Sequence, residues 1–304
     1  MSALAQFIMR GRHQAVLVVA AFTILSWLLS VASLMAAAAL ALPTLRRGPL
    51  EGAWVAALAL PVVALAGHFV MGGALEAAGF ALIIWLPTWV AAFVLRETAR
   101  LDRAVLATTG LGMLAVMLAY LVMDDPQAFW RGQFQVLLKP LIETQMPAGS
   151  DEAMSLTLDL FARYATGAVS AGSVLSVLIS LLIARWWQAG LFNPGGFRPE
   201  FTALTLGQPA ALVFLLIVGL IGFLGDAFGL FLANLLLPAL MAFLLSGFSV
   251  LHAVCGMHPT GRFWLTGIYL ALMFVTPLIL VVTLIGVTDP WVRWRQRFGS
   301  PRPN

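Results

Sequence analysis

The chain has 304 residues, of which 61% are hydrophobic and only 10% are charged. Soluble globular domains are about 45–50% apolar and about 25% charged, so the composition excludes an ordinary soluble domain. The formal net charge of +4 does not indicate nucleic-acid binding, because the basic residues form short clusters between apolar stretches rather than a separate basic domain.

Eight stretches without Asp, Glu, Lys or Arg, each 19 to 35 residues long, follow one another between Gln14 and Asp289. About 20 apolar residues in a helix cross the hydrocarbon core of a bilayer. Runs this continuous do not fit the alternating strands of a barrel. We therefore predict an all-α, polytopic membrane bundle of about eight to nine transmembrane helices, forming one domain over residues 1–304. The stretches are 14–45, 52–75, 77–95, 104–123, 164–184, 201–225, 227–261 and 263–288.

The first stretch, 14–45, is too long for one span, and Ser30 and Ser33 interrupt it. Two short helices, roughly 14–29 and 31–45, would form a hairpin. With that hairpin, the short loops carry ten arginines on one side of the membrane and four on the other; a single crossing gives six and eight. Because cytoplasmic loops are enriched in Lys and Arg, the sequence predicts the hairpin and a cytoplasmic N-terminus.

The four arginines on the opposite side all lie at the C-terminus, after the stretch 263–288. Pro277, in the middle of that stretch, removes a backbone donor and favours a break in the helix. Two alternatives stay open: a ninth span, or a turn that returns the C-terminus to the cytoplasm.

Segment 124–163 is the only sizeable region between apolar stretches, and it contains six acidic and three basic residues. About 40 residues build little core, so we expect an extracytoplasmic segment that lies along the interface. Its second half should continue as a helix into the stretch that begins at 164. The apolar stripe expected to face the membrane consists of Trp130, Phe134, Leu137 and Leu141, which follow helical spacing.

Three polar residues within or beside the apolar stretches are candidate functional groups, because polar groups are costly there. Asp226 lies between Gly225 and Gly229, and its favoured interpretation is a tight turn. The alternative is a buried carboxylate that faces a cavity. For Asn234 the favoured interpretation is a hydrogen bond between helices, and the alternative is a contact with a ligand. For Glu76 the favoured interpretation is an acidic residue in a loop. The alternative is an acid at the mouth of a pocket that binds a cation.

Small residues recur at steps of four in 164–184, at Gly172, Ser176 and Ser180. Such a stripe lets helices approach closely, so we expect it to pack inside the bundle.

The most distinctive segment is 185–206, predicted to be a cytoplasmic loop. Trp186 and Trp187 suit interfacial anchors, and the Asn-Pro-Gly-Gly sequence forces a compact turn. A turn with anchors is the favoured interpretation, and a docking loop for a cytoplasmic partner is the functional alternative, with Arg198 and Glu200 as a charge pair. The candidate docking residues are Asn193, Pro194, Gly195, Gly196, Phe197, Arg198 and Glu200.

The usual catalytic and metal-binding motifs are missing from the sequence. It has no Gly-rich phosphate loop ending in Gly-Lys-Ser/Thr, no His-Glu-x-x-His and no Gly-x-Ser-x-Gly. The four histidines lack the spacing of a zinc site, and Cys255 is the single cysteine. We therefore predict no enzymatic activity, no cofactor and no metal.

Three segments of the chain resemble one family. They are Asn193-Pro194-Gly195-Gly196-Phe197-Arg198 with Glu200-Phe201, the early turn Leu45-Arg46-Arg47-Gly48, and the ending Gly286-Val287-Thr288-Asp289 before an Arg cluster. This family is the YybS-like family of predicted membrane proteins, whose function is unknown. That family is distantly similar to the substrate-binding S components of energy-coupling-factor vitamin transporters. The resemblance implies a helical core around a small-molecule pocket. It also implies a membrane partner docked on a small-residue stripe such as Ala32-x-x-x-Ala36.

Taken together, these features predict a transporter-like protein: a small-molecule-binding membrane subunit that acts with a partner protein in the bilayer. The alternative is a scaffold or regulator of envelope or signalling proteins that docks through 185–206 and 124–163. Sixteen of the seventeen basic residues are Arg and alanine is abundant, which is typical of bacteria from GC-rich genomes. The expected location is the bacterial inner membrane, and no nucleic-acid partner is expected.

Overall fold

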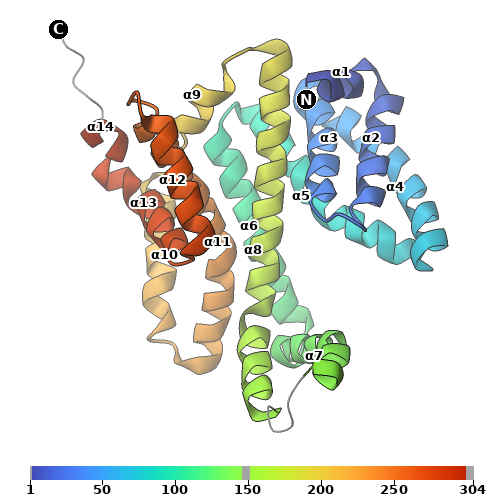
Figure 1. Ribbon diagram of the computed structural model, residues 1–304, viewed down its shortest axis with the longest axis vertical. Helices are drawn as coiled ribbons and strands as arrows, with labels where there is room; N and C mark the ends of the chain where they lie inside the picture. Colours follow the sequence, from blue (N-terminus) through green and yellow to red (C-terminus); the bar gives the residue numbers. More distant parts are fainter. Residues whose placement is uncertain (1, 146–150, 299–304) are drawn as a thin grey trace.

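The structure is a computed structural model that describes residues 2–145 and 151–298, and every regular element in these ranges is a helix (Figure 1). Five of the described helices are long and apolar enough to cross a membrane: α4 (Pro49–Met71), α5 (Ala74–Thr98), α6 (Leu101–Val122), α8 (Asp151–Phe192) and α11 (Gly225–Cys255). By helix length and composition the chain is a multi-pass membrane protein, so the all-helical class predicted from the sequence is confirmed.

The predicted number of eight to nine spans is not confirmed. Four further apolar helices have only 14 or 15 residues: α2 (Arg12–Leu25), α10 (Gly207–Ile221), α12 (Gly261–Phe274) and α13 (Leu278–Val292). At a rise of 1.5 Å per residue such helices reach about 22 Å, less than the roughly 30 Å of a bilayer core. The charge-free stretches therefore overestimate the number of full-length spans.

The first apolar stretch is divided as its serines predicted. After α1 (Ser2–Arg10), α2 leads through a turn at 26–31 into α3 (Ala32–Arg47), and the two helices pack as a hairpin. Six consecutive side chains of α3, from 37 to 42, are completely buried, because its alanines let α2, α5 and α8 approach closely. Ala32 and Ala36 are buried as well, so this stripe packs inside the chain rather than facing a partner.

Helix α7 (Pro126–Gln145) lies beside the N-terminal part of α8, at the bottom of the view in Figure 1. The indole Nε1 of Trp130 donates to Thr166 Oγ1 at 2.9 Å, and Arg131 pairs with Asp159 at 3.0 Å. The predicted stripe is therefore divided: Trp130 contacts α8, whereas Leu137 is 71% exposed. The side chain of Leu141 lies outside the described residues. As predicted, the second half of the segment belongs to one helix, α8, which begins at Asp151 and continues without a break into the apolar stretch that begins at 164.

The last apolar stretch is broken at 275–277, between α12 and α13, and α13 packs along α11. The short helix α14 (Trp294–Phe298) follows. In Figure 1 the chain descends through α12 and rises through α13, so the first described helix, α1, and the last, α14, lie at the same end of the molecule. Of the two alternatives left by the sequence, the structure has the one in which the chain turns back near Pro277.

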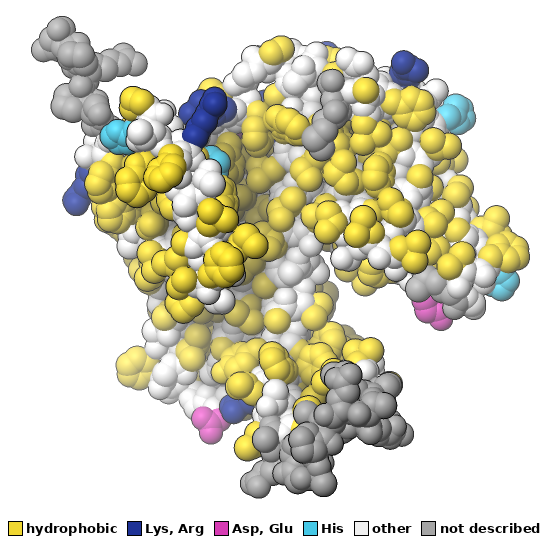
Figure 2. All heavy atoms as spheres, in the orientation of Figure 1, with side chains coloured by type: hydrophobic (Ala, Val, Ile, Leu, Met, Phe, Trp, Pro, Cys, Tyr) yellow, Lys and Arg dark blue, Asp and Glu magenta, His cyan; other side chains and the backbone are white. Residues whose placement is uncertain are grey.

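Arginine contacts join the helix ends at this shared end of the bundle. Arg47 donates to the Met9 carbonyl at 2.5 Å, and Arg12 pairs with Glu51 at 2.6 Å. Arg side chains are visible toward the top of the view in Figure 2. We call this end, marked by Arg12, Arg47, Arg96, Arg185 and Arg295, the basic end.

The basic end should face the cytoplasm. Topology reporters fused after Arg12, after Arg47 and at the C-terminus should all read cytoplasmic, because both helical hairpins return the chain to the side enriched in arginine. A reporter fused after Gln127, at the start of α7, should read extracytoplasmic and serves as the control. Opposite readings after Arg12 and Arg47 would mean one long first span. An extracytoplasmic C-terminus would mean that 263–288 crosses the membrane.

Candidate functional site

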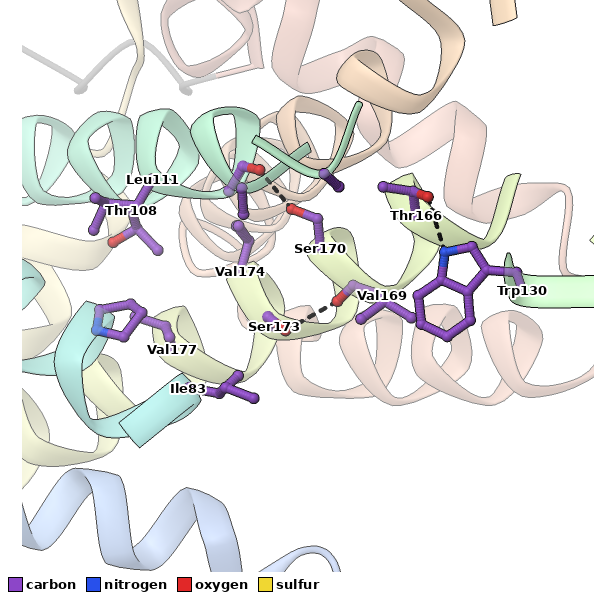
Figure 3. Close-up of a pocket in the computed structure, with 14 residues that line it drawn as sticks. Ile83, Thr108, Leu111, Trp130, Thr166, Val169, Ser170, Ser173, Val174 and Val177 are labelled. Carbon is purple, nitrogen blue, oxygen red and sulfur yellow. Dashed lines mark hydrogen bonds between the residues drawn. The ribbon is translucent and has the colours of Figure 1, made fainter. Parts of the chain in front are cut away.

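A cavity of about 240 Å³ lies between α5, α6, α7 and α8, at the level of the middle of α6 and α8 (Figure 3). Most of its wall is apolar, with Ile83 and Pro87 from α5, Leu111 from α6 and Val169 from α8. Among the side chains that the structure describes, none that lines it is charged. We call this space the mid-span cavity.

Helix α8 supplies the hydroxyl-bearing wall of the mid-span cavity. Thr166, Ser170, Ser173 and Val177 are four, three and four residues apart, which places them on one face of a helix (Figure 3). Thr108 of α6 adds a further hydroxyl, and Trp130 of α7 lies at one end of the cavity. Of these residues, only Trp130 was singled out from the sequence, although the spacing of the three hydroxyls in α8 could have identified that face.

Three of the hydroxyl groups around the mid-span cavity already donate a hydrogen bond to a backbone carbonyl, and the Thr166 hydroxyl accepts one from Trp130. Thr108 donates to the Ala104 carbonyl at 2.9 Å and Ser170 to the Gly112 carbonyl at 2.7 Å. Ser173 donates to the Val169 carbonyl at 2.9 Å. The cavity therefore offers a bound molecule mainly apolar surface, with weakly polar oxygen atoms that can accept a hydrogen bond. This surface suits a small, largely apolar molecule and does not suit an ion.

Gly112 fixes the width of the cavity. A methyl group at this position would lie 3.0 Å from Ser170 Oγ and would overlap Val174. Only glycine therefore lets α6 approach α8 closely enough for the Ser170 hydroxyl to reach the Gly112 carbonyl.

Asn234 joins three helices and is completely buried. Its Oδ1 accepts a hydrogen bond from the Gly167 amide at 2.7 Å, while its Nδ2 lies 2.9 Å from the Arg163 carbonyl and 3.1 Å from Tyr120 Oη. Arg163 and Gly167 are four apart, so this carbonyl and amide are the pair that a regular helix joins. Both oxygen and nitrogen of the Asn234 amide are engaged within the protein, which agrees with the helix–helix interpretation.

Asp226 and Glu76 lie at exposed helix starts. Asp226 is in the first turn of α11, after the turn at 222–224, and Glu76 is in the first turn of α5. Acidic side chains are favourable there because the N-terminal end of a helix carries partial positive charge. The buried-carboxylate alternative for Asp226 is wrong, and neither residue lines the mid-span cavity.

The stripe predicted on α8 lies only partly inside the bundle. Ser180 is buried, and the hydroxyl of Ser176 donates to the Gly172 carbonyl. Gly172 is exposed, and a methyl group built on it would have no neighbour within 4 Å. The close approach on α8 is made instead at Gly167, where a methyl group would overlap the backbone of Asn234.

The segment 185–206 is less of a loop than predicted. Helix α8 continues to Phe192, and α9 (Phe197–Thr202) begins after a turn that leaves Asn193 and Pro194 exposed. Gly195 has φ +87°, a backbone conformation that favours glycine. Trp186 is 45% exposed and suits an interfacial anchor, but Trp187 is only 4% exposed and packs in the core.

The expected pair between Arg198 and Glu200 is not formed. Glu200 pairs with Arg185 at 2.7 Å, which ties α9 to α8. The carbonyls of Phe201 and Leu204 accept hydrogen bonds from the Ser249 hydroxyl of α11, at 2.7 and 3.2 Å. Most of the predicted docking segment is thus held against the bundle, and the turn at 193–195 is its free part.

Within the part of the chain that the structure describes, no three His, Cys, Asp or Glu side chains converge to hold a metal ion. Comparisons with protein-family models, with curated proteins and with solved structures find no match to this chain.

Proposed function

We propose that the protein is a transporter-like membrane subunit that binds a small, largely apolar molecule in the mid-span cavity and acts with a partner protein. The observation that carries the proposal is the cavity itself: Thr108, Ser170 and Ser173 lie near the middle of two long apolar helices. A pocket at this depth is where small-molecule transporters bind their substrates. The composition and the resemblance to YybS-like proteins favour the bacterial inner membrane as its location.

The class of ligand follows from the lining. Ligand pockets are mostly apolar and have a few polar atoms that fix orientation, as here. Because none of the described residues that line the cavity is charged, an ionic substrate would lose its hydration without compensation. We therefore propose an uncharged molecule that buries mainly hydrocarbon or aromatic surface and donates one or two hydrogen bonds to hydroxyl oxygens.

A cavity-filling substitution tests this function. Ala115 lines the cavity and is exposed, so Ala115→Phe should occupy the space without displacing buried neighbours. Leu106→Phe, at an exposed position of the same helix that does not line the cavity, is the matched control. Organic extracts of the purified full-length proteins would be compared by mass spectrometry. We expect one or more compounds to be enriched in the wild type and in Leu106→Phe, and to be depleted about tenfold in Ala115→Phe.

The opposite outcome supports the alternative function. If all three proteins carry the same lipids and nothing else, the cavity is not a ligand site. The scaffold or regulator alternative would then be preferred. The observation in its favour is the exposed turn at Asn193 and Pro194, which projects from the basic end where α8 leads into α9.

A further inference from the structure

Two adjoining hollows lie at the basic end, outside the site described above. The first, of about 640 Å³, lies between the ends of α3, α5, α8 and α9, and its polar wall includes Arg46, Arg96 and Arg185. The second, of about 560 Å³, lies between α1, α3 and α8 and is lined by Arg10, Arg46 and Arg47. Arg46 and Phe192 belong to both.

Arg46 is the cation at the centre of this arrangement. Its guanidinium lies 4.3 Å from the centre of the Phe192 ring, which holds it between the two hollows. Among the described residues it has no carboxylate partner. By contrast, Arg185 is neutralised by Glu200, and Arg47 lies 3.6 Å from Glu51.

The remaining groups of the first hollow leave it positive. Arg96 donates to the Leu45 carbonyl at 2.7 Å, and its Nε lies 3.9 Å from Glu97, whose side chain is 55% exposed. The amide of Gln188 also lies beside the Leu45 carbonyl, at 3.4 Å, and adds a neutral donor to the wall. The described residues that line the second hollow include three arginines and no acid.

We infer that the paired hollows at the basic end bind a phosphoryl group through Arg46, and that its source is the headgroup of an anionic phospholipid. A guanidinium presents two parallel N–H donors that match phosphate oxygens. Basic pockets between helix ends at the cytoplasmic surface are suited to anionic headgroups. Apolar residues that border the hollows, such as Leu191 and the exposed Phe192, would contact the glycerol and the first part of the acyl chains.

The test compares Arg46→Gln with Arg262→Gln in the full-length protein. Both residues are exposed arginines, and Arg262, at the start of α12, lines neither hollow. Each protein would be exchanged into nanodiscs of phosphatidylcholine with phosphatidylglycerol, and bound lipid would be counted by native mass spectrometry. We expect preferential retention of phosphatidylglycerol by the wild type and by Arg262→Gln. Arg46→Gln should lose about tenfold in occupancy, as expected for a lost charge-assisted hydrogen bond.

A second arm identifies the source of the phosphoryl group. Inorganic phosphate would be titrated into the wild type and Arg46→Gln by calorimetry. Phosphatidylglycerol retention without phosphate binding supports the lipid headgroup. Phosphate binding that Arg46→Gln abolishes, without a lipid preference, keeps the phosphoryl site but assigns it to a soluble phosphate compound. Equal lipid retention in all three proteins with no phosphate binding would overturn the inference, as would equal losses in both variants. Neither outcome bears on the mid-span cavity.

Discussion

Replacing Gly247 with alanine should destabilise the protein by about 3 kcal/mol, at the upper end of what overpacking costs. Gly247 of α11 lies against α13, and a methyl group there would overlap the Val282 carbonyl. Gly286 of α13 makes the reciprocal contact, because a methyl group on it would overlap the Phe243 carbonyl. Backbone atoms cannot rotate away as a flexible side chain can, so the two helices would have to separate.

Gly267→Ala is the matched control for this substitution. Gly267 lies inside α12, and a methyl group there would meet nothing within 4 Å. Alanine at such a site should leave stability unchanged or raise it by up to about 1 kcal/mol, because glycine weakens a helix interior. Unfolding in mixed micelles with increasing dodecyl sulfate would compare the three proteins. Similar midpoints for Gly247→Ala and Gly267→Ala would show that α11 and α13 are not in close contact.

Replacing Arg295 with methionine should cost about 3 kcal/mol, the typical loss when one partner of a buried ion pair is removed. Arg295 is paired with Asp289, which is only 4% exposed, and it donates to the carbonyls of Thr202 and Leu204 at 2.8 and 2.6 Å. It also donates to Ser249 Oγ at 2.9 Å. The substitution would therefore leave a buried carboxylate unpaired and release the segment after α9.

The double variant Arg295→Met with Asp289→Leu separates these two effects. If the unpaired carboxylate causes most of the loss, removing it should recover more than half of the lost free energy of unfolding. The same dodecyl sulfate titration measures both variants, and proteolysis in the segment 203–206 reports whether that segment is released. A single variant as stable as the wild type would mean that Arg295 does not hold the C-terminal hairpin to the segment after α9.

The pairing of Glu200 shows why charge pairs were not predictable from sequence proximity. Arg198 and Glu200 are two residues apart, and side chains two apart in a helix do not face each other. In α9, Glu200 instead faces Arg185 at the end of α8, fifteen positions earlier. The exposure of Gly172 was unpredictable for a similar reason. The spacing of a small-residue stripe shows that its residues share one helix face, but it does not show which other helix, if any, packs against that face.

The sequence by itself determined that the chain is a helical membrane protein, because runs without charge can satisfy their backbone in a bilayer only as helices. It also determined the N-terminal hairpin and the helix–helix role of Asn234, which follow from local interruptions and from the cost of a polar amide among apolar residues. Only the tertiary structure decided that 263–288 turns back, that a cavity lies beside Ser170, and that Arg46 faces two hollows. These features depend on which faces of separate helices meet, and helices in a bilayer are matched by the shapes of their side chains rather than by a hydrophobic pattern that the sequence displays.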